Sequence, residues 1–480
     1  MKLENFIKSI NEDLEILIKE KDSEIKTLTE NNYLLNEENQ YLSEELSHYR
    51  STKLGKLVQT YYKLLETSPL IKAFLKFLLF LFSFVLAPLR FITNNKVEIE
   101  SINQNDYLSE EIIEIIRESP FKKVIFFIAP VVWDIPLYQR PQHIAYYLSK
   151  QKVLYFYLVK EECETAIKEV SPNCYEIRMK GLDFDYLTKI VKETKGREVF
   201  LHTYSTELKD INSLIDVFKR HKAKVIYEYI DEISEHIAGM KIPEHVVRTF
   251  ERLVRDEDDT YFITSATRLF EDALYYRKKK LALITNGVEY EHFSQKFEKK
   301  DLPFEMLRIF SQNKPIIGYY GAIASWMDYE LIKYLASKKP NYNFVIIGLD
   351  YDGSVSKSGL EQYSNIYVLP PVHYKKLPRY AYFFDICTIP FKINEITLST
   401  SPIKLFEYMA LKKPIVTTAM PECKKYKSVL IGETYEDFLK KIDKGLSLSK
   451  DAKYLSLLEK EAKENTWESK AQEIIKLIDS

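Results

Sequence analysis

From residue 123 onwards, the sequence alternates short apolar runs with segments of helical periodicity, and this alternation limits the possible folds most strongly. Such runs are typical of strands buried on both faces of a parallel sheet. The first series of predicted strands is 124–129, 153–158, 198–203, 224–230, 260–263 and 282–285. After a polar connector near 298–302, the second series is 315–320, 344–348, 366–369, 384–390, 414–417 and 428–431. The sequence therefore predicts an α/β protein with two doubly wound, Rossmann-like domains, residues 107–297 and 298–480, facing a cleft at the carboxyl ends of their strands.

Residues 1–50 contain no proline or glycine and repeat apolar residues every seven positions. Ile18 and Ile25 share one heptad position with Asn32 and Asn39, and leucines occupy much of the other. This pattern predicts a coiled coil, most simply a parallel dimer whose register the two asparagines would fix. The alternative is a single solvated helix, but isolated polar-rich helices of this length are marginal in water.

Residues 51–106 are predicted to form a basic helix, an apolar segment and a polar linker. The uncharged core of the apolar segment, Phe77–Leu89, has 13 residues, whereas a helix needs about 20 to span a bilayer. Lys72, Lys76 and Arg90 flank it and could reach lipid headgroups. The alternatives are a packed core helix, a spanning helix and a monotopic helix. We expect peripheral or monotopic attachment to the cytoplasmic face of a membrane.

The charge balance narrows the possible functions. The 69 basic and 70 acidic residues nearly cancel, which argues against a nucleic-acid binder that relies on bulk attraction. The four cysteines have no metal-binding spacing, and no cluster of histidine, cysteine and carboxylate residues demands a metal. We therefore expect no metal, no cofactor and no nucleic-acid partner.

The stretch Ser399–Ala410 carries the most specific chemical signal. It follows a predicted strand, and its hydroxyl side chains lie at a predicted helix N-cap, next to a proline that suits the first helical turn. A helix start offers free backbone N–H groups and the positive end of a dipole, so it can hold a phosphate. The residues expected to surround this phosphate are Ser399, Thr400, Ser401, Pro402 and Ile403. The alternative is a capped core helix without a ligand.

Two charged residues, Lys404 and Glu407, lie on one side of this predicted helix because they are three positions apart. Lys404 adds a positive charge to the first turn. A cation beside a phosphate-sized site, with a carboxylate one turn deeper, suits a nucleotide. The phosphates would meet the lysine, and the ribose hydroxyls would meet the glutamate.

The run SPIKLFEYMALKKPIV, residues 401–416, resembles the donor-site signature of GT-B glycosyltransferases, specifically glycosyltransferase family 4 and its bacterial polysaccharide-assembly members. The resemblance implies that the helix start and Lys404 hold the diphosphate of a sugar nucleotide and that Glu407 binds the ribose. The family usually has another glutamate eight positions earlier, in contact with the donor sugar, and here Ser399 stands at that position. We expect backbone or hydroxyl groups of residues 399–401 to make that contact instead.

Shorter motifs extend the resemblance to about residues 123–480. Ile284–Val288, followed by Phe293, is similar to the family's interdomain segment. Gly321 lies in a run similar to the first strand and loop of the nucleotide domain. His373 lies in a segment similar to the one that lies against the nucleotide base. The resemblance thus adds Gly321 and His373 to the expected donor site.

The loop after the first predicted strand is rich in polar and aromatic side chains, and it suits acceptor binding. Trp133 lies at its start, and Arg140 and His143 open a helix where they could meet an anionic acceptor. His202 follows the run EVFL, residues 198–201, near the end of one predicted strand, and Asp231 follows the strand 224–230. His143, His202 or Asp231 could be the general base or a ligand of a sugar hydroxyl. The alternative for each is a structural role, and His143 could be a helix-surface or half-buried histidine.

These features together predict a retaining, metal-independent glycosyltransferase of the hexosyltransferase type. It would move a sugar from a nucleoside-diphosphate sugar to a growing, lipid-linked surface glycan, with retention implied by the resemblance. The helix start and Lys404 would stabilise the departing diphosphate. The expected partners are the nucleotide sugar, the glycan acceptor, a membrane surface and a second copy of the chain. The alternatives are a GT-B nucleotide-sugar epimerase and a non-catalytic scaffold that binds a sugar nucleotide and oligomerises through the coiled coil.

Overall fold

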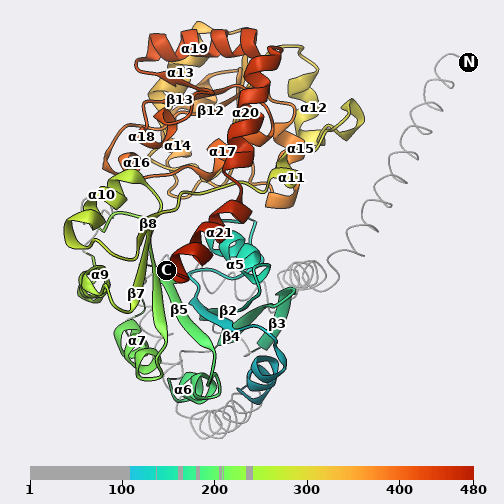
Figure 1. Cartoon of the computed structure of the whole chain (residues 1–480). Helices are drawn as coiled ribbons and strands as arrows, with labels where there is room; N and C mark the ends of the chain where they lie inside the picture. Colours follow the sequence, from blue (N-terminus) through green and yellow to red (C-terminus); the bar gives the residue numbers. More distant parts are fainter. Residues whose placement is uncertain are drawn as a thin grey trace, which may run out of the picture. The chain divides into compact units, whose positions relative to one another are not determined.

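The structure is a computed structural model that describes residues 109–136, 138–160, 166–179, 184–204, 208, 210–233 and 242–480. The predicted coiled coil and the predicted apolar segment lie outside the described residues. All described residues belong to one compact unit, which contains two sheets (Figure 1). We call the two parts built on these sheets the first and the second lobe.

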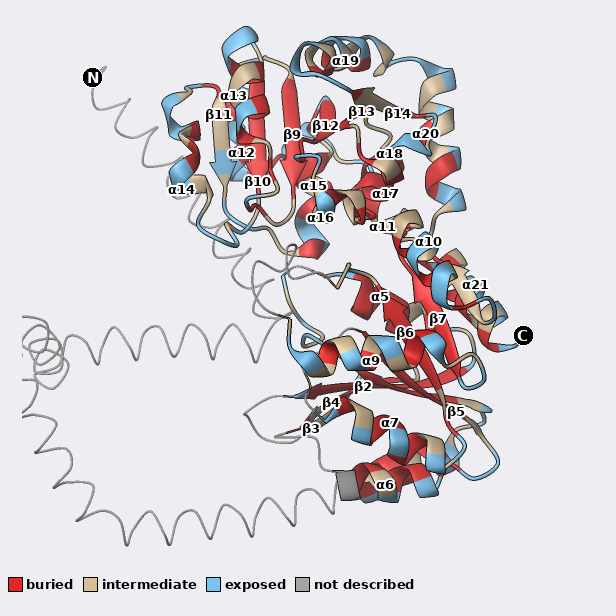
Figure 2. Cartoon of the chain, turned by 90° about the vertical axis from the view of Figure 1, so that its left-hand side faces the viewer, coloured by how far each residue is buried: buried red, intermediate tan, exposed pale blue. Residues whose placement is uncertain are grey.

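The first lobe is built on an eight-stranded sheet with the order β3-β4-β2-β1-β5-β6-β7-β8. Its strands are β1 (Lys123–Ile128), β2 (Val153–Lys160), β3 (Ala166–Ser171), β4 (Cys174–Met179), β5 (Glu198–Tyr204), β6 (Lys224–Tyr229), β7 (Thr260–Thr264) and β8 (Leu281–Leu283). Six of these match the predicted series to within two residues at each end, which confirms that prediction. The central strands are buried along their length (Figure 2), as continuous apolar runs require.

The hairpin of β3 and β4 at the edge of this sheet was not predicted. β4 pairs with β2 in parallel, and β3 returns antiparallel along β4. β3 is largely exposed and β4 is only partly buried, so neither strand consists of a continuous apolar run. Pro172 and Asn173 form the turn, where Asn173 has a φ of 65°, a conformation that asparagine tolerates.

Helices cover both faces of the first sheet. One face packs against a helix at residues 109–118 and against α6 (Phe184–Lys192), α7 (Ile211–Arg220), α9 (Glu244–Arg255) and α10 (Thr267–Tyr276). The other face packs against α5 (Arg140–Ser149) and the last helix, α21 (Trp467–Ile478). The first lobe is therefore a doubly wound α/β layer structure, completed by residues from the end of the chain.

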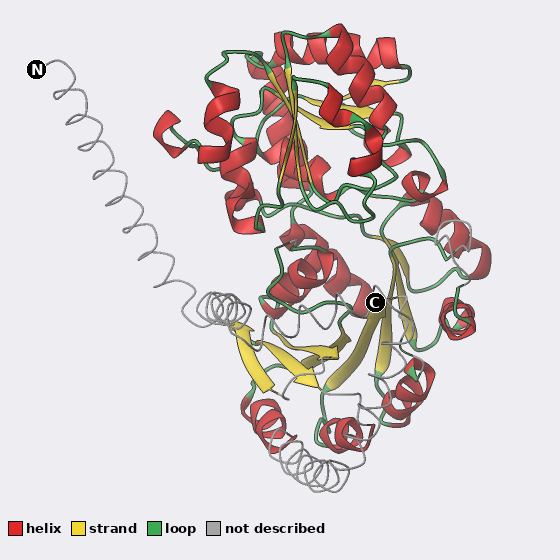
Figure 3. Ribbon diagram, turned by 180° about the vertical axis from the view of Figure 1, so that it is seen from behind, coloured by secondary structure: helices red, strands yellow, loops and turns green. Residues whose placement is uncertain are grey.

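The second lobe is a six-stranded parallel sheet with the order β11-β10-β9-β12-β13-β14 and with helices on both faces (Figure 3). All six strands were predicted. They are β9 (Ile316–Tyr320), β10 (Asn343–Ile347), β11 (Ile366–Leu369), β12 (Ile386–Ile389), β13 (Ile415–Thr418) and β14 (Val429–Gly432). α13 (Tyr329–Lys338) and α19 (Tyr435–Leu448) pack on one face, and α12 (Phe304–Phe310), α17 (Ile403–Ala410) and α20 (Ala452–Glu464) contribute to the core on the other. Short helical turns complete the lobe: α11 (Tyr290–Phe293), η1 (Lys299–Asp301), α14 (Val355–Ser358), η2 (Leu360–Gln362), η3 (Tyr374–Lys376), α15 (Leu377–Ala381), α16 (Glu395–Leu398) and α18 (Pro421–Lys424).

The chain crosses between the lobes at residues 284–288 and again at residues 465–467. These two crossings touch, because Val288 pairs with Thr466 in a short β-bridge. A Cβ atom on Gly287 would lie 2.9 to 3.0 Å from backbone atoms of residues 465–467. Glycine at this position therefore allows the two crossing segments to pack backbone against backbone.

Candidate functional site

A cleft of about 500 Å³ lies where the carboxyl ends of the two sheets face each other. Tyr204 ends β5 and Asp231 follows β6 on the first lobe, while Tyr320 ends β9 and Gly321 follows it on the second lobe. The cleft is lined by Pro130, Val131, Pro136, Tyr138, Gln139, Arg140, Pro141, Tyr204, Ile230, Asp231, Ser265, Asn286, Tyr320, Gly321, Ala322, Tyr374, Leu377, Thr400, Ser401, Pro402, Ile403, Lys404 and Glu407. In doubly wound sheets, ligands bind at this end of the strands.

The start of α17 forms part of the wall on the second lobe. Pro402 is the N-cap residue, with φ −72° and ψ 118°, and no side chain caps the helix. The predicted hydroxyl cap is therefore wrong: Ser399 donates to Glu232 Oε2 at 2.7 Å, and Thr400 donates to the carbonyl of Ile396 at 2.6 Å. No side chain accepts from the backbone N–H groups of the first turn, and apart from that of Leu405, which donates to the Pro402 carbonyl at 3.1 Å, they remain available to an anion.

Lys404 projects from this first turn between two aromatic rings and the backbone of Gly321. Its Nζ lies 5.4 Å from the ring centre of Tyr319 and 5.2 Å from that of Phe391. A Cβ on Gly321, whose φ is 134°, would lie 2.8 Å from Lys404 Cε. Burial lowers the pKa of Lys404, and the carboxylate of Glu407 partly opposes this effect. A lysine held in this way interacts strongly with an anion, because little water screens it.

Glu407 lies one turn deeper on the same side of α17. It is 5% exposed, and its Oε2 accepts a hydrogen bond from the Tyr320 hydroxyl at 2.8 Å. Burial raises the pKa of Glu407, against the lowering effects of that hydrogen bond and of Lys404. Its other carboxylate oxygen has no partner among the described residues and can accept from a ligand hydroxyl. The expected juxtaposition of Lys404 and Glu407 is thus present in the cleft.

A chain of buried polar groups supports the wall on the first lobe. Arg140 Nε donates to Glu228 Oε2 at 2.5 Å, and His202 Nε2 lies 2.8 Å from Glu228 Oε1. His202 Nδ1 in turn lies 2.8 Å from the Tyr155 hydroxyl. Burial opposes the charge of Glu228, but Arg140 and His202 hold its pKa below the usual value of 4.5. Arg140 is therefore neutralised by a buried carboxylate.

Asn286 connects this buried chain of polar groups with the start of α17. Arg140 Nη1 donates to Asn286 Oδ1 at 3.2 Å and to the carbonyl of Thr285 at 3.1 Å. Asn286 Nδ2 then donates to the carbonyl of Ser401, immediately before α17, at 2.6 Å. The sequence reading missed Glu228 and Asn286 as site residues. A charged residue within the apolar run KVIYEYI was a signal for the first, because a buried carboxylate needs a partner.

Comparison with solved structures identifies the architecture. The chain superimposes on a glycosyltransferase from Rickettsia africae ESF-5 with a TM-score of 0.58 and 14% identity, covering 74% of this chain and 97% of the other. It also superimposes on Anabaena HepE, solved in complex with UDP and glucose, with a TM-score of 0.53 and 11% identity, covering 75% of this chain and all of the other. The chain has the GT-B fold. No protein-family model matches it.

One curated relative aligns with part of this GT-B chain. It is named as a teichuronic acid biosynthesis glycosyltransferase, TuaH of Bacillus subtilis (strain 168), and it is 27% identical over 271 residues. The alignment covers 53% of this chain and 66% of the relative, which is just under two thirds of that protein's length.

Of the three candidate bases, the GT-B cleft contains only Asp231. This carboxylate is accessible and forms no hydrogen bond or ion pair with another described residue. His202 is fully buried in the chain of polar groups behind the wall. His143 is buried too, with its ring stacked on Trp467 at 4.8 Å, and burial, with a smaller effect of His292, holds its pKa well below the usual value.

Two further expected residues lie outside the wall of the cleft. His373 caps η3 by accepting from the Lys375 N–H at 3.3 Å, and its Nε2 lies 3.7 Å from Asp134. Trp133 packs edge-on against Tyr138 and Tyr157 instead of facing the cleft. The aromatic groups that do line it are Tyr204, Tyr320, Tyr138 and Tyr374, and the rings of the last two stack 5.2 Å apart across the two lobes.

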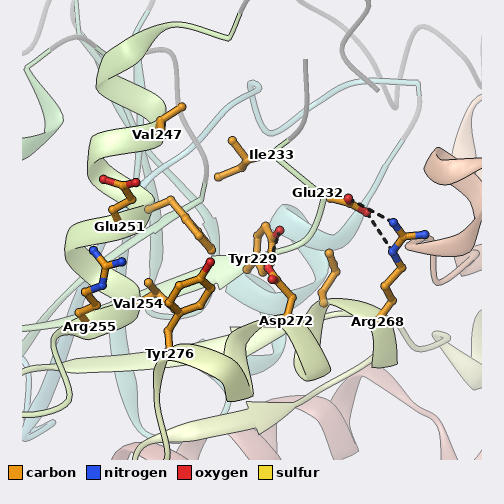
Figure 4. Close-up of a pocket in the computed structure, with 12 residues that line it drawn as sticks. Tyr229, Glu232, Ile233, Val247, Glu251, Val254, Arg255, Arg268, Asp272 and Tyr276 are labelled. Carbon is orange, nitrogen blue, oxygen red and sulfur yellow. Dashed lines mark hydrogen bonds and ion pairs between the residues drawn. The ribbon is translucent and has the colours of Figure 1, made fainter. Parts of the chain in front are cut away.

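A second cavity, of about 380 Å³, lies in the first lobe between α9 and α10 (Figure 4). Glu232 at its rim forms an ion pair with Arg268, and the Tyr229 hydroxyl donates to Asp272 at 3.2 Å. Glu232 also accepts the hydrogen bond from Ser399. Ser399, which stands where the family has its first glutamate, therefore contacts a carboxylate from the other lobe and does not line the cleft.

The described residues contain neither a metal-binding cluster nor a helix that could span a membrane. No group of three or more histidine, cysteine or carboxylate side chains is arranged to hold a metal ion in the part of the chain that the structure describes. None of the helices within that part has both the length and the hydropathy needed to cross a bilayer.

Proposed function

We propose that this chain is a glycosyltransferase that transfers a sugar from a nucleoside-diphosphate sugar to a surface glycan. The observation that carries the proposal is the uncapped start of α17 in the GT-B cleft, with Lys404 in its first turn and Glu407 one turn deeper. The solved UDP complex of Anabaena HepE and the assignment of TuaH to teichuronic acid biosynthesis support it. A weakly screened cation and free N–H groups suit a diphosphate leaving group.

On the donor side, the first-turn N–H groups and Lys404 bind the diphosphate. Glu407 accepts hydrogen bonds from the ribose, and Gly321 leaves room for the nucleotide beside the lysine. Thr400, Ser401, Pro402 and Ile403 form the wall around these groups. Lys404 then stabilises the negative charge that develops on the diphosphate as the bond to the sugar breaks.

On the acceptor side, Asp231 accepts a hydrogen bond from the attacking hydroxyl. It is the accessible carboxylate on the first-lobe wall, whereas His143 and His202 are buried behind that wall and Arg140 lines it with its charge neutralised by Glu228. We further propose that the sugar is a hexose, that transfer proceeds with retention and without a metal, and that the acceptor is lipid-linked. We assign attachment to the cytoplasmic face of the membrane, and dimerisation, to residues 1–106, which lie outside the described residues.

The test measures nucleotide release from a panel of nucleoside-diphosphate sugars, with and without acceptor glycans. Replacing Lys404 by methionine should lower turnover about 10²-fold, because a preorganised charge at the leaving group is lost. Lys392→Met is the matched control, since Lys392 is exposed, donates to the carbonyl of Ser325, and lies outside the cleft. Near-parental turnover of Lys404→Met would contradict the proposal. Formation of an epimer from the donor alone would instead indicate an epimerase, and donor binding without turnover would indicate a scaffold.

A further inference from the structure

The charges that line the cleft are distributed unevenly between its two walls. Among the lining residues that the structure describes, four are charged: Arg140, Asp231, Lys404 and Glu407. Lys404 and Glu407 stand together on α17 at the donor wall, where a diphosphate would engage the lysine. The acceptor wall carries the other two, and their environments differ strongly.

Arg140 does not offer its charge to a ligand. Glu228 neutralises it from behind, Thr285 and Asn286 occupy Nη1, and Nη2 is shielded from solvent without a hydrogen-bond partner among the described residues. The histidine nearest to this arginine in the sequence, His143, is buried against Trp467 and lies outside the cleft. The earlier expectation that Arg140 and His143 meet an anionic acceptor is therefore wrong for this arrangement.

Asp231 is the opposite case, because it is accessible, faces the cleft and has no partner among the described residues. The first-lobe lining of the cleft also contains the rings of Tyr138 and Tyr204, apolar groups such as Ile230, and the uncharged polar side chains of Gln139 and Ser265. Aromatic faces favour the apolar face of an uncharged pyranose and offer no compensation for a buried anion. With the donor diphosphate in place, a second negative group near Asp231 would meet repulsion from both sides.

We propose that the acceptor wall selects an uncharged sugar, with Asp231 accepting its hydroxyl and rejecting an acceptor whose terminal sugar is a uronate. This inference rests on the proposed glycosyltransferase function and specifies the class of its acceptor. Asp231 then has two effects that separate experimentally: it binds the hydroxyl, and it discriminates by charge. The second effect is the one that a merely structural residue would not show.

The experiment uses pairs of methyl glycosides that differ only in oxidation at C6: glucoside and glucuronide, and galactoside and galacturonide. Binding of each to the UDP-saturated full-length chain is measured by calorimetry, and kcat/KM is measured with the donor found in the nucleotide-release panel. We expect a preference of at least about tenfold for the neutral member of a pair, because Asp231 and a uronate carry like charges and repel each other. Asp231→Asn should reduce this ratio at least about threefold, and higher salt should reduce it in the parent. Glu251→Gln, in the second cavity of the same lobe, is the matched control and should leave the ratio unchanged.

A uronate bound as well as its neutral partner would overturn the inference, and so would a ratio that Asp231→Asn leaves unchanged. Binding of none of the four glycosides would also overturn it. Since donor turnover is measured independently, these outcomes remain distinct from failure of the proposed function, in which no nucleotide sugar is consumed. If Asp231→Asn abolishes turnover, the calorimetric ratio still decides the question.

Discussion

The buried pair of Arg140 and Glu228 permits a test that separates stability from positioning. Glu228→Gln removes the charge that neutralises Arg140 while keeping the shape of the side chain. Losing one partner of a buried ion pair costs about 3–5 kcal/mol, because the other charge stays buried without compensation. We expect the free energy of unfolding to fall by about that amount. The assay is urea denaturation followed by tryptophan fluorescence, to which Trp467 in the core of the same lobe contributes together with Trp133 and Trp326.

The double variant Arg140→Met with Glu228→Leu removes both charges together. Apolar replacement of a buried ion pair is often neutral or stabilising, so most of the loss should be recovered. About 1–3 kcal/mol should remain missing, because His202 Nε2 loses its partner. Turnover should nevertheless stay about tenfold or more below the parent, since Asn286 is no longer held by the arginine and the start of α17 loses its support.

Arg277→Met is the control for these variants. Arg277 is equally buried in the first lobe, but it donates to backbone carbonyls of Leu253, Thr260 and Lys279 and does not line the cleft. It should therefore destabilise the protein without changing the turnover of the folded fraction. The reasoning is refuted if Glu228→Gln unfolds at the same urea concentration as the parent, or if the double variant is no more stable than the single one.

Four further results are expected. The pKa of Glu228 is lowered in the folded state, so its contribution to stability is complete above its usual pKa of 4.5 and is lost as the pH falls through the folded value. The difference in unfolding free energy between the parent and Glu228→Gln should therefore narrow below about pH 4.5 in acid titrations. Glu407→Gln should raise the KM for the donor by the equivalent of about 1–3 kcal/mol, whereas an unchanged KM would make this carboxylate structural. Gly321→Ala should weaken UDP binding, measured by calorimetry, more than it lowers stability, because its Cβ would displace Lys404. Gly353→Ala controls for backbone strain, since Gly353 has a φ of 69° and open space around it. Equal effects of the two variants on UDP binding would refute the role of Gly321. The full-length chain should float with anionic liposomes while a chain that starts at Lys96 should not, since the apolar segment and its lysines would bind lipid; flotation of both would exclude that segment as the anchor.

The central strands were predictable from the sequence because a strand buried on both faces of a parallel sheet must be apolar along its whole length. The outer strands β8, β11 and β14 are only partly buried but are still short apolar runs. The Lys404 and Glu407 pair was predictable for a similarly local reason, because residues three apart on a helix lie on one side. The hairpin of β3 and β4 was missed since an edge strand is free of that requirement. The sequence could therefore predict features that depend on a single strand or helix and on its neighbours along the chain.

The placement of the acceptor-side residues depended on where strands end, which the sequence indicates less well. β5 continues to Tyr204, so His202 lies within the strand and its side chain points into the core under α5. β6 ends at Tyr229, so Asp231 lies beyond it and reaches the cleft. A shift of two or three residues relative to the end of a strand thus decides whether a side chain is buried behind the wall or faces a ligand in the cleft. The contact of Arg140 with Glu228, 88 positions away, is long-range and has no local signal.

The position of α21 has a consequence for the biosynthesis of this protein. One face of the first sheet is covered by α5 together with Trp467, Ala471, Ile474 and Ile478, residues that a ribosome adds only after the whole second lobe. Throughout translation of residues 285–466, the part of that apolar face beside α5 has no partner, and a nascent first lobe exposes it to chaperones and to other chains. The second lobe does not depend on α21 in this way and can fold as soon as its own strands are made. The order of synthesis and the order of folding are thereby reversed, and shortening the chain by one helix at its end would damage the domain that is made first.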